Sequence, residues 1–476
     1  MGKITKNYIY NLVYQLFILL VPLVTAPYLA RTLGAVGTGI YGYVYSMTSM
    51  ICTIVLLGIY SYGNRQIAYV RDDKQKINTV FWQIISDRLI IAIIGTIIYF
   101  VIVLLIGKYI KLFIIFYMYL LAYFCDCTWL FVGLEDMKWA VIKNAITKIL
   151  AVIGIFAFVR DTNDVAVYVF IQGGAVLISN ILAYSQIHQY VSKPKLDFTN
   201  FKNDILGSFW LFLPSVAATI YTQSDKVMIE LITGLTDQVS YYDYAEKIVT
   251  IPLTFITVLS TVMMPRIANE FKKNNKEVIS HLLSVAANFS LFVAFPMMFG
   301  LVSVADKMVP WYLGDKFLPT IQAIIMISPI ILTNTLTGIS GGQYFTATNQ
   351  IKILTVSQFF AAIANLIINA ILIPKFGFYG AAFATAITSA SCAAYQYWFL
   401  LKQVKLPGLF RSAIKYIIFS LIMFGIIKVI TMDMAASPLT NVIQILIGFV
   451  VYFGLCVITK DKQVKLIKNK IVKDKD

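Results

Sequence analysis

Residues 205–265 have the sequence ILGSFWLFLPSVAATIYTQSDKVMIELITGLTDQVSYYDYAEKIVTIPLTFITVLSTVMMP. They form two apolar segments of membrane length. Six charged side chains nevertheless lie within or at the edges of these segments: Asp225, Lys226, Glu230, Asp243, Glu246 and Lys247. One charge at the bilayer centre costs about 2.5–3.5 kcal/mol, so such residues usually face the interior of a helix bundle or a wet cavity. The stretch therefore predicts a helical membrane protein with a polar interior.

The same stretch repeats features of the N-terminal part of the chain. A shift of 200 positions places Gly234 on Gly34 and Tyr241 on Tyr41. Two similar halves that face a polar cavity are typical of transporters, in which the substrate binds between internal repeats. We therefore expect two pseudo-symmetric lobes around a central cavity.

The composition excludes a soluble protein. The chain is 59% hydrophobic and 13% charged, with a mean hydropathy of +0.78, whereas soluble domains carry about 25% charged residues. The net charge of +16 does not indicate nucleic-acid binding, because the basic residues lie in short gaps between apolar runs and in a C-terminal tail. The 5 cysteines lie in apolar segments and the chain has only 2 histidines, so we expect neither a metal site nor a cofactor.

An apolar run of about 20 residues is long enough to cross a bilayer. The sequence predicts an all-α polytopic membrane protein with about 14 transmembrane helices. The predicted spans are 11–30, 40–60, 84–106, 110–132, 139–158, 165–186, 205–233, 239–264, 282–304, 318–343, 353–373, 378–401, 414–430 and 439–458.

These spans divide the chain into five predicted parts. Residues 1–190 form an N-lobe of six helices, 191–204 a cytoplasmic linker and 205–401 a C-lobe of six helices. Residues 402–459 add two helices, and 460–476 form a basic cytoplasmic tail. With the N-terminus inside, most lysine and arginine residues of the short loops fall on the inner side. The positive-inside rule therefore predicts that both termini are cytoplasmic.

Lys148 is the strongest candidate for a functional side chain. It lies near the middle of the fifth predicted span, next to Ile149 and Leu150. An ammonium group at this depth needs an acid, carbonyl groups, water or an anionic ligand. Two interpretations stay open: a structural ion pair with Asp126 on the fourth span, or a cation that lines a cavity and receives an anion.

Other basic residues could line the same cavity: Arg88, Lys226, Lys247 and Arg31. Arg88 could equally extend to the inner interface. Lys226 and Lys247 can each pair with an acid four positions away, Lys226 with Glu230 and Lys247 with Asp243. Arg31 ends the first span, where an interfacial anchor is the more ordinary role.

Three acidic residues are candidates for coupling transport to a proton or a sodium ion. Asp225 and Glu246 have no partner at helical spacing on their own segments, and Asp126 lies within the fourth predicted span. Asp225 could meet a cation across the cavity. The sequence leaves the coupling ion open.

No motif indicates catalysis. The glycine-rich residues 34–39 lie at a turn between two predicted spans and lack the Lys-Ser/Thr ending of a nucleotide-binding loop. The chain also lacks a nucleophile-plus-base arrangement. We therefore expect a protein that is not an enzyme and does not hydrolyse ATP itself.

Four short motifs carry a resemblance to a known family. They are PYLARTLG at 27–34 with GIYG at 39–42, WLFVGLEDM at 129–137, YDYAEKI at 242–248 and MPRIA at 264–268. Together they resemble bacterial polysaccharide repeat-unit flippases of the Wzx type. These are members of the multidrug/oligosaccharidyl-lipid/polysaccharide exporter superfamily. The motifs lie in the first 270 residues or so, and the predicted helices of the remainder fit the family.

The resemblance implies two six-helix lobes around a V-shaped cavity, often followed by two extra helices. It implies a multi-pass protein of the bacterial cytoplasmic membrane that turns an undecaprenyl-pyrophosphate-linked oligosaccharide to the outer leaflet. Membrane lipids and, as partner proteins, a polysaccharide polymerase and other assembly proteins are implied with it. Family members use cationic lumen residues, and Arg88, Lys148, Lys226 and Lys247 match these by chemistry and approximate place.

Three alternatives stay open. A lipid II flippase of the same superfamily also fits the helix count. A drug or cation antiporter would favour an acidic lumen, which Lys148 opposes. A membrane glycosyltransferase or polymerase would need a large outer loop with catalytic residues, and the longest outer gap, 305–317, is short.

Overall fold

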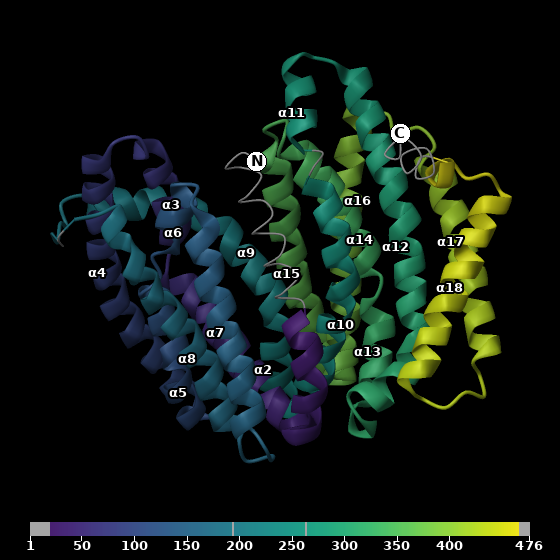
Figure 1. Cartoon of the computed structure of the whole chain (residues 1–476), viewed down its shortest axis with the longest axis horizontal. Helices are drawn as coiled ribbons and strands as arrows, with labels where there is room; N and C mark the ends of the chain where they lie inside the picture. The colour runs from purple at the N-terminus through teal and green to yellow at the C-terminus, as the bar shows by residue number, and fades with distance from the viewer. Residues whose placement is uncertain (1–19, 193–194, 262–263, 466–476) are drawn as a thin grey trace. The chain divides into compact units, whose positions relative to one another are not determined.

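The computed structural model of the chain describes residues 20–192, 195–261 and 264–465, and regular secondary structure within these ranges is helical throughout (Figure 1). Residues 11–19 of the first predicted span, and residues 466–476 of the predicted basic tail, lie outside these ranges. Residues 20–32, the end of the first span, are helical.

The described part of the first half contains residues 20–32, eight further α-helices and a short 3₁₀ helix, η1. They are α2 (Gly34–Val55), α3 (Ile59–Val70), α4 (Lys74–Ile106), α5 (Ile110–Phe124), α6 (Thr128–Gly133), α7 (Met137–Phe158), α8 (Val165–Ala183), η1 (Tyr184–Gln189) and α9 (Phe201–Thr233).

The second half follows the same all-helical plan. Its elements are α10 (Thr236–Thr261), α11 (Met264–Lys272), α12 (Lys276–Tyr312), η2 (Asp315–Phe317), α13 (Pro319–Ile327), α14 (Ile330–Thr337), η3 (Gly338–Phe345), α15 (Ile351–Phe376), α16 (Phe378–Gln403), α17 (Leu409–Ile430) and α18 (Pro438–Ile458).

The all-α membrane class predicted from the sequence is confirmed. Among the described residues, nine helices are long and apolar enough to cross a membrane, or eleven when two bent helix pairs are each counted as one span. Every predicted span after the first overlaps a helix or a group of consecutive helices. The predicted count of fourteen is not reached by this criterion. One reason is that α16 is long enough but rich in Ala, Ser and Thr.

The packing of the chain divides into two compact units, Met1–Ser240 and Tyr241–Asp476. The boundary falls at Ser240 and not at the predicted linker 191–204, because α9 packs against α2, α3 and α4 of the first unit. The predicted lobes are defined by pseudo-symmetry and stay a prediction.

Close backbone contact explains why α9 belongs to the first unit. Gly58 has a positive φ of 72° and begins α3 at a 48° bend after α2. A Cβ atom there would lie 2.9 Å from the carbonyl oxygen of Ser208 and from the amide nitrogen of Phe212, both on α9. A larger residue at position 58 would therefore force the backbones of α3 and α9 apart.

The backbone also supports the predicted 200-residue repeat. Gly34 is the first residue of α2, directly after the first helix, and Gly234 lies between α9 and α10. Both glycines have a φ of 68°, a left-handed conformation that favours glycine. The two positions that match in the sequence therefore make equivalent turns.

In the second unit, α17 and α18 pack against α12 (Figure 1). Phe292 of α12 contacts the rings of Tyr416 of α17 and Tyr452 of α18. The Tyr452 hydroxyl donates a hydrogen bond of 2.8 Å to the carbonyl oxygen of Phe292. The two helices that follow residue 402 are thus joined to the second unit by a buried aromatic core.

Candidate functional site

Both ends of α9 carry polar contacts to the other helices of the first unit. Asp204 lies in the first turn of α9 and Glu230 in its last turn. At 1.5 Å per residue they are separated by about 39 Å of helix. That length is comparable to the hydrocarbon core of a bilayer with part of its interfaces. We refer to these regions as the Asp204 end and the Glu230 end.

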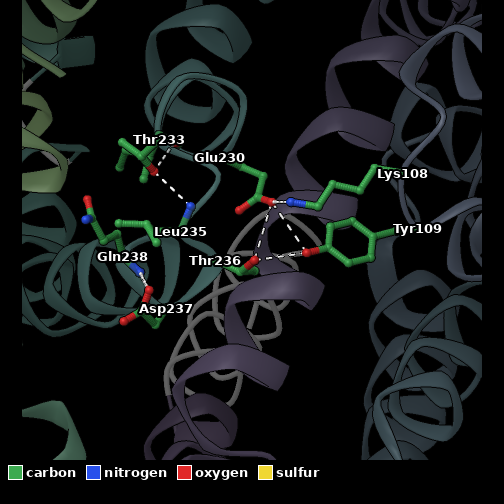
Figure 2. Close-up of polar contacts among 9 residues, drawn as sticks. Lys108, Tyr109, Glu230, Thr233, Leu235, Thr236, Asp237 and Gln238 are labelled. Carbon is green, nitrogen blue, oxygen red and sulfur yellow. Dashed lines mark hydrogen bonds and ion pairs between the residues drawn. The ribbon is translucent and has the colours of Figure 1, made fainter. Parts of the chain in front are cut away.

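At the Glu230 end, one buried carboxylate accepts hydrogen bonds from three donors (Figure 2). Glu230 Oε1 accepts hydrogen bonds from the Lys108 ammonium, from Tyr109 Oη at 3.4 Å and from Thr236 Oγ1 at 3.3 Å. Tyr109 Oη and Thr236 Oγ1 are also 2.9 Å apart. The Glu230 side chain is 1% exposed and that of Lys108 is 46% exposed. The contact joins α9 to the α4–α5 connection by a charge-assisted bond.

Local sequence brings these groups together. Gly107 and Tyr109 both have positive φ values, 66° and 56°, which turn the chain sharply between α4 and α5. Gly234 ends α9 and returns the chain so that Thr236 lies beside Glu230 (Figure 2). The hydrogen bond with Glu230 raises the pKa of Lys108 above its ordinary value. Lys108 therefore stays protonated throughout the neutral range.

At the Asp204 end, a second buried carboxylate binds α9 to α3 and α4. Asp204 Oδ1 accepts a hydrogen bond of 2.7 Å from Tyr62 Oη, and Oδ2 accepts one of 3.0 Å from Gln83 Nε2. All three residues are buried. Because each donor is neutral, this end has no cation to balance the carboxylate among its hydrogen-bond partners in the described chain.

Arg88 braces a break in the fourth span. The chain leaves α5 at Phe124 and resumes as α6 at Thr128. Arg88 is 2% exposed, and its guanidinium donates to the carbonyl oxygens of Tyr123, at 2.8 Å, and of Asp126. The structure thus brings the predicted residues Arg88 and Asp126 together, through the backbone of Asp126. This contact differs from the predicted extension of Arg88 to the inner interface, and its role as a cation that lines the cavity stays a prediction.

Replacing Arg88 by methionine should lower the stability of the folded protein by about 2–4 kcal/mol, because two buried carbonyl groups lose their donor. Thermal unfolding of the purified protein measures this change. Arg71→Met is the matched control, since Arg71 pairs with Glu135 at 2.8 Å with both side chains about half exposed. Such pairs contribute about 0–1 kcal/mol. Equal shifts in Tm for the two variants would show that Arg88 does not brace the break.

Lys143 is a buried cation that the sequence analysis missed. It is 1% exposed, and its Nζ donates to Asn144 Oδ1 at 3.1 Å, Asn180 Oδ1 at 3.3 Å and Ser179 Oγ at 3.4 Å. Its hydrogen-bond partners in the described chain include no acid. Lys143 lies within the predicted span 139–158, and that position is the signal in the sequence that could have identified it.

Lys148 lies on a different face of α7 from Lys143, since five positions correspond to about 140° around a helix. It is half-buried, and the described residues give it no hydrogen bond or ion pair. The predicted pairing with Asp126 is not formed, because Asp126 Oδ1 accepts the backbone N–H of Thr128 at 2.8 Å. The interpretation of Lys148 as a cation available to an anionic ligand therefore stays as a prediction.

Of the two predicted i,i+4 pairs, one is formed and one is not. Lys247 Nζ lies 2.5 Å from Asp243 Oδ2, so that prediction is confirmed. The prediction that Lys226 pairs with Glu230 is wrong, because Glu230 is held by Lys108, which lies 122 positions earlier in the chain. A buried carboxylate at the end of a helix is accessible to neighbouring segments as well as to its own helix.

The remaining predicted site residues occupy varied environments. Asp225 and Lys226 are 1% and 5% exposed, Glu246 is half-buried, and Arg31 is exposed at the end of the first helix. Their roles in binding a substrate or a coupling ion stay predictions. Within the described ranges, no group of three or more His, Cys, Asp or Glu side chains could hold a metal ion.

Comparison with known proteins gives one family and two groups of relatives. Residues 4–271 match the family described as "Polysaccharide biosynthesis protein". The chain is similar to the "Putative O-antigen transporter" of Escherichia coli (strain K12). The two are 26% identical over 392 residues, which cover 81% of this chain and 94% of that protein.

Solved structures share the fold. "Lipid II flippase MurJ, inward closed conformation" matches with a TM-score of 0.71 and 21% identity, covering 96% of this chain and 98% of that one. An inward-facing MATE family multidrug transporter of the MOP superfamily matches with a TM-score of 0.64 and 14% identity, covering 82% and 94%. These similar proteins are transporters and flippases, not enzymes. The family match covers more than half of the sequence, and the chain therefore belongs to the polysaccharide biosynthesis protein family, with a fold shared by these two solved transporter structures.

Proposed function

We propose that the protein is a flippase that moves undecaprenyl-pyrophosphate-linked oligosaccharide repeat units from the inner to the outer leaflet of the bacterial cytoplasmic membrane. The observation that carries this proposal beyond the family is Lys148, a half-buried cation in a membrane span with no partner among the described residues. An intramembrane charge of this kind usually marks a substrate or ion pathway.

The chemistry of a pyrophosphate headgroup suits such a cation. A phosphate oxygen that accepts a hydrogen bond from an ammonium forms a short, charge-assisted contact. When the inside of the membrane is 100 mV negative, the outward movement of each negative charge is favourable by about 2.3 kcal/mol of free energy. The membrane potential alone can therefore favour export of an anionic lipid.

An apolar groove in the second unit offers room for a polyprenyl chain. Its volume is about 690 Å³. It is lined by residues of α10, α12, α17 and α18, among them Pro252, Gly300, Met423 and Phe449. Almost all of the lining is hydrocarbon or aromatic, so a lipid tail can lie there without leaving an apolar environment.

Filling this groove should impair transport of substrates with long lipid tails. A Cβ atom at Gly300 would meet only Met423 Cε, at 3.9 Å, so Gly300→Leu can be accommodated while it narrows the groove. We expect flipping of an undecaprenyl-linked substrate to fall about five- to tenfold, and flipping of a short-prenyl analogue to fall less.

Gly425→Leu is the matched control, because Gly425 lies on α17, has open space around it and does not line the groove. The measurement is flipping in liposomes with the two substrates side by side. Equal losses of flipping rate for both tail lengths would show that the groove does not bind the lipid tail.

We further propose that both termini are cytoplasmic and that transport proceeds by alternating access. In this orientation the Asp204 end of α9 faces the cytoplasm and the Glu230 end faces outward. The polar contacts at the two ends would then open in alternation. A polysaccharide polymerase and other assembly proteins are the proposed partners that receive the product.

A liposome assay with defined lipid-linked oligosaccharides, with and without ion gradients and a membrane potential, tests this function. We expect oligosaccharide-linked undecaprenyl pyrophosphate to be flipped, and Lys148→Ala to flip it much more slowly than wild type. Lipid II and a cationic drug serve as competing substrates. Preferential transport of lipid II would favour a lipid II flippase, and transport of the cation alone would favour an antiporter.

A further inference from the structure

A buried carboxyl group next to the Asp204 end has no role in the site described above. Asp87 of α4 is 0% exposed, and neither of its carboxyl oxygens has a hydrogen-bond partner in the described chain. The neighbouring residue Arg88 cannot neutralise it, because the Arg88 guanidinium is directed to the carbonyl groups at the α5–α6 break. An ionised carboxylate in this position would be strongly destabilised by the loss of its hydration.

The charged groups that act on Asp87 are themselves acids. Asp204 of α9 lies near it, since Gln83, one turn before Asp87 on α4, donates to Asp204. Asp197, on the segment before α9, donates its backbone N–H to Ser86, the residue before Asp87, at 2.9 Å. The other polar groups of this region are already engaged: Tyr62 of α3 and Gln83 of α4 donate to Asp204. Arg65, on α3, lies over the Tyr62 ring, 5.4 Å from its centroid.

We propose that Asp87 and Asp204 together form a proton-binding site, in which one proton is shared between the two carboxyl groups while α9 is packed against α4. Two adjacent buried carboxylates cannot both be ionised at an acceptable cost. Asp204 already accepts two hydrogen bonds, which stabilise its charged form. Protonated Asp87 then donates its O–H to Asp204, whose oxygens can each accept a further bond. One proton thus gives one of the two Asp87 oxygens a hydrogen-bond partner and leaves a single negative charge on the pair.

The site couples proton binding to the position of α9. When the Asp204 end separates from α3 and α4, water reaches Asp87 and the repulsion by Asp204 is lost. The O–H bond of Asp87 then breaks, the electron pair remains on its oxygen and the proton passes to water. Proton binding therefore stabilises the packed state of this end and its release accompanies opening. As a step in transport, this inference rests on the proposed alternating-access function.

Infrared spectroscopy of the purified protein in nanodiscs tests proton binding without transport. We expect wild type to show the C=O stretch of a protonated carboxylic acid that disappears as the pH is raised. The band should be absent in Asp87→Asn and present in Asp197→Asn, the matched control from the same region. Persistence of the band in Asp87→Asn would overturn the proposal, as would its loss when Na⁺ is added at constant pH, which would indicate a sodium site.

A second variant keeps the test decisive if Asp87→Asn does not fold. In Asp204→Asn the like charge is removed, so the Asp87 band should disappear at a pH lower by about one unit or more. An unchanged pH dependence would contradict a shared site. Flipping in liposomes then tests coupling: an imposed pH gradient should change the wild-type rate and leave the Asp87→Asn rate unchanged. Absence of any flipping by wild type would refute the proposed function and leave the spectroscopic result standing.

Discussion

Replacing Lys148 by alanine is expected to reduce flipping of an undecaprenyl-pyrophosphate-linked oligosaccharide by about 10- to 100-fold. A hydrogen bond to a charged group contributes about 1.5–3 kcal/mol, and every 1.4 kcal/mol corresponds to a tenfold change. Because Lys148 has no partner among the described residues, its removal breaks no internal contact that the structure records. The protein should therefore remain folded, and the loss should appear in transport rather than in Tm.

Two matched variants make this prediction specific. Lys148→Arg keeps the positive charge and should retain part of the activity. Lys138→Ala removes an exposed lysine from the start of the same helix and should leave flipping unchanged. The measurement is the initial rate in liposomes, with membrane insertion checked by the amount of reconstituted protein. Wild-type flipping by Lys148→Ala would remove this residue from the substrate pathway.

The sequence predicted the architecture because hydrophobic length is a strong signal. Segments of about 20 apolar residues appear as helices almost wherever they were expected, and the Gly34 and Gly234 turns repeat as the 200-residue shift predicts. The backbone requirements of a membrane span make helix the only practical solution for such segments. Boundaries and bends were not predictable in the same way. The 48° bend at Gly58, for example, depends on its contact with α9.

Predictions of charge partners succeeded only where the partner lies on the same helix. Lys247 and Asp243 pair as their spacing predicts, because helical geometry fixes the distance between positions i and i+4. Glu230 instead binds Lys108, and the Asp204 carboxylate binds Tyr62 and Gln83, each more than 100 positions away. A single sequence contains no information on which helices become neighbours. The partners of buried charged residues on other parts of the chain could therefore be identified only from the structure.

Single substitutions at the Lys108–Glu230 contact should lower the stability of the folded protein. The substitution of Lys108 should cost more than that of Glu230, although Glu230 is the more deeply buried of the two. Lys108→Met leaves the carboxylate of Glu230 buried without a cation, whereas Glu230→Gln removes the buried charge itself. Breaking a buried pair on one side costs about 3–5 kcal/mol. Lys108 is 46% exposed, so solvent reduces this to about 1–3 kcal/mol. Glu230→Gln should cost less, because its amide oxygen can still accept from Tyr109 and Thr236.

A double-mutant cycle on Tm and on flipping rate measures this coupling. Adding Glu230→Gln to Lys108→Met should restore part of the lost stability, since no buried charge then remains. Lys273→Met, which removes the lysine of the exposed pair with Glu270 on α11, is the control and should change Tm little.

The pH dependence of this contact follows from the same geometry. Because the pKa of Lys108 is raised by its bond to Glu230, the contribution to stability is fully present below the unfolded-state pKa of about 10.4. This contribution to stability is lost only as the pH rises through the higher pKa that Lys108 has in the folded state. The stability difference between wild type and Lys108→Met should therefore stay constant across the neutral range and shrink in strongly alkaline buffer. Additive effects of the two substitutions, or a difference that already disappears near neutral pH, would mean that this ion pair does not hold the Glu230 end closed.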